Sequence, residues 1–108
     1  MSNIKEYKNI MAFHPGCYVE EAIQDMKISQ ANFAKRLGIP ERTLSLFIDG
    51  QIDVSYNLAK RLSMVLGTSI RFWFNLQCTY YRKMTKIWHA EYIDKHKKKR
   101  GFNYGRDE

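Results

Sequence analysis

Histidine and cysteine are the residue types in this chain that could bind a metal or take part in catalysis. His14 and Cys17 are separated by two residues, a spacing typical of half a zinc site, and the other candidates, Cys78, His89 and His96, are remote in sequence. No second close pair completes a ligand set, and no histidine or carboxylate pair is placed to activate Cys17 or Ser45 as a nucleophile. We interpret His14 as a capping residue and Cys17 as a buried thiol. We therefore expect no metal, no cofactor and no enzymatic activity.

A second set of polar side chains fits the recognition of double-stranded DNA. Arg42 carries a planar guanidinium that can donate two hydrogen bonds to the edge of a guanine, and Thr43 and Ser45 can reach phosphates or bases. Gln30 begins an expected helix, where a phosphate is favourably placed beside the positive end of the helix dipole. The predicted DNA-facing residues are Gln30, Glu41, Arg42, Thr43, Ser45 and Leu46.

The segment from Ser29 to Gly50 contains the elements that must position these side chains. It has two short apolar patterns of helical period, with only Gly38–Pro40 between them. Ser29 can cap the first helix, and glycine can end it with a positive φ. Two helices joined by so tight a turn are typical of a helix-turn-helix, whose second helix enters the major groove, and Ala34 is small enough for their close approach. The core-facing residues of the second helix are then Leu44, Phe47 and Ile48.

Three further helices are expected around this pair. One enters at His14 and Pro15, and another is capped by Ser55. The last is capped by Thr68 or Ser69, and it should continue past Tyr92 or break only briefly because no glycine or proline interrupts it. No strand pattern stands out. The sequence therefore predicts an all-α fold of five helices.

The last helix carries an apolar stripe at steps of three and four residues. A helix that presented this stripe to water would expose several large side chains, each worth roughly 1.5 to 3 kcal/mol on full burial. A symmetric partner is the simplest cover, so we predict a homodimer with two recognition helices about one DNA turn apart and a near-palindromic operator. The predicted dimer contacts are Tyr81, Met84, Ile87, Trp88 and Tyr92.

Length, composition and charge limit the classes that fit. The chain has 108 residues, 44% of them hydrophobic, which suits one domain. Its net charge of +7 is concentrated at the C-terminus: residues 1–81 carry nine Lys or Arg against seven Asp or Glu, and residues 82–108 carry nine against four. No segment approaches the ~20 apolar residues of a membrane span, and two distant cysteines fit a reducing cytoplasm. We divide the chain into a polar N-terminal arm (1–13), a helix-turn-helix DNA-binding domain (14–81), a helical dimerisation extension (82–100) and a tail (101–108).

From "HPG" at His14, through "SQANFAKRLGIPERTLSLFIDG", to "LGTSIRFWFNLQ" ending at Gln77, the chain closely resembles the HigA antitoxins. These are a branch of the lambda-repressor-like helix-turn-helix superfamily, and the last of the three motifs is the most distinctive. The resemblance implies a five-helix lambda-repressor-like DNA-binding domain with an extended C-terminal helix. It also implies a dimeric repressor that binds its own promoter and sequesters a HigB-type toxin, a small mRNA endonuclease.

Two other functions remain open on the sequence. The chain could be a plain dimeric repressor, as in phages, without a toxin partner. It could also be an interaction module that has lost DNA binding, because Glu41 places a negative charge beside the expected phosphates and Leu46 stands where many relatives of the resembled family have a polar residue. A short reading frame for a basic protein beside the gene would favour the antitoxin.

Overall fold

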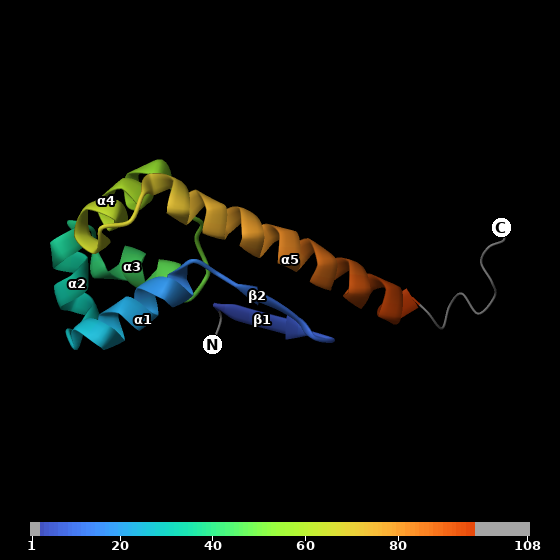
Figure 1. The fold of residues 1–108 in the computed structure, drawn as a ribbon. Coiled ribbons are helices and arrows are strands. Elements are labelled where there is room, and N and C mark those ends of the chain that lie inside the picture. The colour runs from blue at the N-terminus through green and yellow to red at the C-terminus, as the bar shows by residue number, and fades with distance from the viewer. Residues whose placement is uncertain (1–2, 97–108) are drawn as a thin grey trace.

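A computed structural model describes residues 3–96, in which four short helices gather at one end and a long helix extends away from them (Figure 1). The elements are β1 (Ile4–Tyr7), β2 (Ile10–Phe13), α1 (Gly16–Met26), α2 (Gln30–Leu37), α3 (Glu41–Ile48), α4 (Tyr56–Leu66) and α5 (Ile70–His96). The predicted five-helix fold with an extended last helix is confirmed. Within the described residues, no helix combines the length and apolar character needed to cross a membrane.

The helix boundaries follow from local chemistry, as predicted. The hydroxyls of Ser29, Ser55 and Ser69 each accept a bond from the backbone N–H three residues later, at 3.0, 3.1 and 3.0 Å. Gly38 and Gly67 end α2 and α4 at φ of +78° and +75°. α5 is continuous through the boundary that we predicted between residues 81 and 82. Residues 97–100 of the predicted extension and the predicted tail lie outside the described residues.

The main core lies between the short helices and the first turns of α5. Its largest fully buried side chains include Trp73, Phe33, Phe47, Leu44 and Leu62. Ala34, which we placed at the crossing of the two helices, is also buried.

The expectation of a polar arm without strands is wrong for residues 4–13. They form an antiparallel hairpin in which Tyr7 pairs with Ile10 across a two-residue turn. Lys8 and Asn9 both have positive φ, of 48° and 70°, as the commonest two-residue hairpin turns require. Asparagine adopts this conformation readily, whereas lysine does so rarely, so the sequence carried only half of the usual signal.

The hairpin lies against the second half of α5 and covers part of it (Figure 1). Ala12, Met84 and Ile87 form a small buried cluster between the two elements, with Tyr7 and Tyr80 among the residues at its edge. The reason given above for placing Met84 and Ile87 in a dimer interface is therefore wrong, because the chain covers these side chains itself.

Polar contacts hold the tip of the hairpin to α5. The Tyr7 hydroxyl donates a hydrogen bond to the carboxylate of Asp94, and this bond raises the pKa of Tyr7. Lys8 Nζ lies 2.6 Å from the same carboxylate, and Lys5 Nζ lies 3.6 Å from Glu91. These lysines are about half exposed, so the ion pairs orient the hairpin more than they stabilise it.

His14 joins the hairpin to the helices and is fully buried. Its Nδ1 accepts a bond from Gly16 N–H at 2.9 Å, which confirms the predicted capping role. Nε2 lies 3.0 Å from the carbonyl oxygen of Ile52, so the neutral ring with a proton on Nε2 satisfies both partners. Burial lowers the pKa of His14, against a smaller opposing effect of the Ile52 bond.

Gly16 allows α1 to lie directly against the end of α3. A Cβ at this position would be 2.1 Å from the carbonyl oxygen of Phe47 and 2.9 Å from the Cα of Ile48. Beside this contact, Asn3 donates to the carbonyl oxygen of Ile48 at 2.9 Å and to the carboxylate of Glu20 at 2.8 Å. The segment before α1 is thus attached to the C-terminal end of α3.

We predict that Gly16→Ala destabilises the fold by at least about 3 kcal/mol, because the added methyl group meets backbone that cannot rotate away. Gly67→Ala is the control, because a Cβ at this position has open space around it. This variant should lose only the about 1 to 2 kcal/mol that an alanine costs at positive φ. Urea unfolding measures both. Equal losses for the two variants would show that α1 and α3 do not approach as described.

We predict that the free energy of unfolding decreases as the pH is lowered below about 6.5, which is the pKa of an exposed histidine. In that range the unfolded chain binds a proton at His14 that the folded chain excludes, so the slope is at most about 1.4 kcal/mol per pH unit from this group. His14→Gln should be less stable at pH 8 and should lose this part of the slope. If the free energy of unfolding of His14→Gln changes between pH 6.5 and 5 as steeply as that of the parent, His14 is not the buried neutral group described here.

Candidate nucleic-acid interface

The turn between α2 and α3 holds the two helices in a fixed relation. Gly38 N–H and Ile39 N–H donate to the carbonyl oxygen of Ala34 at 2.9 and 3.1 Å, which closes the end of α2. Ile39 packs against the core, and Pro40, with φ of −65° and ψ of 144°, directs the chain into α3. This is the helix-turn-helix geometry that the sequence predicts.

Arg61 of α4 supports the same turn, a role that the sequence analysis missed. Its Nη1 donates to the carbonyl oxygens of Leu37 at 2.8 Å and Gly38 at 3.3 Å, and its Nε donates to Asn57 at 3.3 Å. A cation at the C-terminal end of α2 also interacts favourably with the helix dipole. The contact joins residues 24 positions apart, so no local spacing reveals it.

The two faces of α3 differ as the spacing predicts. Leu44, Phe47 and Ile48 are buried. On the outer face, Glu41 and Arg42 are exposed, and the half-buried residues are Thr43, Ser45 and Leu46.

The outer polar side chains are not engaged by the chain itself. In the described part of the chain, Arg42, Thr43 and Ser45 form no side-chain hydrogen bond or ion pair. Gln30, the remaining predicted DNA-facing residue, is half-buried at the first position of α2. The outer face of α3 therefore offers one cation, two hydroxyls and one carboxylate to an external partner.

The start of α5 fixes the other side of the helix-turn-helix. Trp73 Nε1 donates to the hydroxyl of Thr68 at 2.7 Å, and Gln77 Oε1 accepts from Val54 N–H at 2.8 Å. Both Trp73 and Gln77 are buried, so the first turns of α5 are part of the core.

Tyr81, one of the predicted dimer contacts, has a contact within the chain. Its hydroxyl lies 2.8 and 2.7 Å from the two carboxylate oxygens of Asp53, and this bond raises the pKa of Tyr81 to about 12. The side chain is still partly exposed. Its hydroxyl thus joins α5 to the segment that follows α3.

Comparison with known proteins agrees with this geometry. A model of a helix-turn-helix family matches residues 19–73. An uncharacterized helix-turn-helix transcriptional regulator of Escherichia coli, YddM, is 33% identical over 69 residues, which cover 62% of this chain and 73% of that protein.

Solved structures show a similar fold over about two thirds to three quarters of the chain. An addiction module antidote protein of the HigA family from Coxiella burnetii is 32% identical with a TM-score of 0.68, covering 77% of this chain and 91% of that one. A Pseudomonas aeruginosa protein solved in complex with its operator DNA is 31% identical with a TM-score of 0.63, covering 68% of this chain and 81% of that one.

Proposed function

The chain belongs to the helix-turn-helix family, within the HigA group of antitoxins, and from this premise we propose that it is a dimeric autorepressor that also neutralises a HigB-type endonuclease toxin. That it is a DNA-binding regulator of the antitoxin type follows from the family and the fold. The operator, the dimer and the toxin are our proposals.

The observation that carries the DNA-binding proposal is the unengaged outer face of α3. Arg42 is exposed beside Thr43 and Ser45, at the start of a helix whose opposite face is buried. A similar protein is solved on operator DNA. We assign Arg42 to a guanine edge, Thr43 and Ser45 to shorter contacts that orient the helix, and Gln30 to a phosphate. Glu41 and Leu46 flank this surface and modulate the choice of operator.

The exposed part of the α5 stripe supports the dimer. Trp88 and Tyr92 are 51% and 60% exposed, although both are large and lie one turn apart. Covering such side chains is favourable, so these two residues are the centre of the dimer interface that we propose. Tyr81 is at its edge, whereas Met84 and Ile87 support it from within the chain. Two-fold pairing gives the near-palindromic operator.

The gene neighbourhood separates an antitoxin from a plain repressor. A short reading frame beside this gene that encodes a small basic protein, toxic when expressed alone and harmless when expressed with this chain, would establish the toxin partner. A gene with no such neighbour would leave a dimeric repressor without a toxin.

We predict that Arg42→Ala weakens operator binding by about 1 to 3 kcal/mol per half-site and relaxes the preference at one base pair in each half. The melting temperature should not change, because this side chain makes no contact with the core. Titration at fixed salt, with the operator and with unrelated DNA, measures both effects.

Lys60→Ala is the control, as an exposed cation on α4. If Lys60 touches DNA, its loss should weaken binding to all sequences alike and reduce the salt dependence. If Arg42→Ala binds the operator with unchanged affinity, α3 is not the element that recognises the operator.

We predict that the double variant Trp88→Ala, Tyr92→Ala is monomeric at micromolar concentration, because the pair loses the burial that holds two chains together. Sedimentation velocity measures the state. The variant should keep its melting temperature at low concentration, since the hairpin packs on Met84 and Ile87 instead. Tyr56→Ala removes an exposed aromatic side chain of α4 and should stay dimeric. A dimeric double variant would disprove this interface.

A further inference from the structure

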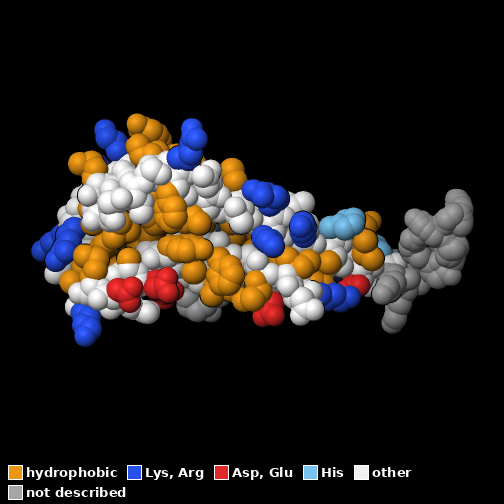
Figure 2. Space-filling view, in the orientation of Figure 1, with side chains coloured by type: hydrophobic (Ala, Val, Ile, Leu, Met, Phe, Trp, Pro, Cys, Tyr) orange, Lys and Arg blue, Asp and Glu red, His pale blue; other side chains and the backbone are white. Residues whose placement is uncertain are grey.

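A shallow groove lies between the hairpin, α1 and α5, on a surface that the proposed DNA and dimer contacts do not use. It has a volume of about 370 Å³ and is lined by Met11, Phe13, Tyr18, Leu76, Thr79 and Lys83. Figure 2 shows it as a large hydrophobic area in the middle of this face of the molecule.

Three large aromatic side chains around this groove are exposed. Phe13, Tyr18 and Phe72 are 41%, 39% and 38% exposed, and the rings of Tyr18 and Phe72 meet edge to face at 6.4 Å. Met11 adds a flexible apolar side chain. Exposed aromatic residues that gather in this way are typical of protein interaction sites.

The border of the groove along α1 is acidic. Glu21 and Asp25 are exposed, and they follow Tyr18 at three and seven residues, so all three lie on one face of the helix. α1 has no Lys or Arg, although the whole chain has a net charge of +7. Figure 2 shows acidic side chains over α1, at the lower left of this face of the molecule. Lys83 of α5 is a cation within the groove lining, so it is the border along α1 that repels phosphate and attracts a cationic surface.

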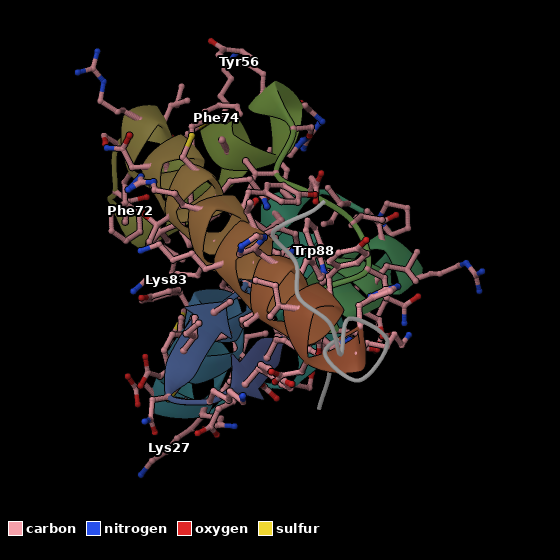
Figure 3. The ribbon with its side chains drawn as sticks, turned by 90° about the vertical axis from the view of Figure 1, so that its right-hand side faces the viewer. Lys27, Tyr56, Phe72, Phe74, Lys83 and Trp88 are labelled. Atoms are coloured by element: carbon pink, nitrogen blue, oxygen red, sulfur yellow. The ribbon has the colours of Figure 1, made fainter. Side chains whose placement is uncertain are left out.

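The groove and the proposed interfaces are on different sides of α5. In Figure 3, Phe72 and Lys83 point to one flank of the helix and Trp88 points to the other. β2 and α1 line the groove together with Lys83, whereas Tyr7 of β1 lies near Trp88. α3 packs its inner face against α1, so its outer face is turned away from the groove. A protein bound in the groove would therefore leave both the recognition helix and Trp88 accessible.

We propose that this groove is the docking surface for the toxin, a basic protein that inserts an apolar side chain between Phe13 and Tyr18 and places cationic groups on Glu21 and Asp25. This inference rests on the proposed function, because it names the surface through which the partner is held. DNA is a poor occupant because the carboxylates of Glu21 and Asp25 repel phosphate, and a second copy of this chain is the alternative that the oligomeric state of the Thr79→Arg variant tests.

The test uses the full chain and the protein encoded by the adjacent reading frame, purified with an inactivating substitution. Tyr18→Ser should weaken binding at least about tenfold in isothermal titration, as expected for an aromatic contact at the centre of an interface. Thr79→Arg fills the groove from the exposed face of α5 without removing a core side chain, and it should have the same effect. The double variant Glu21→Lys, Asp25→Lys should weaken binding and reduce its dependence on salt.

Tyr56→Ser is the matched control, because it removes an exposed aromatic side chain away from the groove. It should bind the toxin like the parent, and Tyr18→Ser and Thr79→Arg should retain operator affinity and melting temperature. If the parent binds the toxin and Thr79→Arg binds it equally well, the groove is not the docking surface, although the antitoxin function stands.

Failure of the parent to bind the toxin would instead overturn the proposed function. A parent dimer that becomes monomeric on Thr79→Arg would assign the groove to a second copy. Competition between the toxin and operator DNA for the parent chain would contradict the separation of the two surfaces.

Discussion

The direct contact between the backbones of α1 and α3 at Gly16 is the constraint on which the rest of the structure depends. Without a side chain at this position, the start of α1 lies against the last residues of the recognition helix. The same region receives hydrogen bonds from Asn3 and His14, so residues from the hairpin, α1 and the segment after α3 meet at one point. The orientation of α3 is therefore determined by contacts at its C-terminal end and on its buried side, and Arg61 holds the turn that precedes it.

What the sequence could predict was local. Serine caps, the positive φ of Gly38 and the inward face of α3 depend on neighbours within four residues, and all are present. The candidate DNA-facing residues were predictable for the same reason, because helical period alone separates Arg42 from Leu44. The hairpin was not predictable in this way. Its strands have four residues each, its turn lacks glycine, and its support comes from Ile87 and Asp94, more than 70 residues along the chain. Because the hairpin was not predicted, Met84 and Ile87 were expected to be exposed and available to a second chain.

α5 connects the different parts of the molecule. Its first turns complete the core around Trp73, its second half carries the hairpin, and its two flanks present Lys83 and Trp88 in opposite directions (Figure 3). A continuous helix is rigid over this length, so surfaces on its two flanks keep a fixed relation to α3. The surfaces that we propose for DNA, for a second copy and for the toxin are thus separate and have no hinge between them.

The pairing of the hairpin with the far end of α5 also determines when the protein can be complete during its synthesis. Tyr7 leaves the ribosome well before Asp94, to which it is hydrogen bonded, because Asp94 is 87 residues further along the chain. The helices between residues 16 and 66 can pack as soon as they emerge, whereas β1 and β2 have unpaired edges and no supporting surface until α5 has been made. The hairpin, although translated before the five helices, is therefore the last of these elements to acquire its supporting surface, and nascent chains that stop before α5 carry it uncovered.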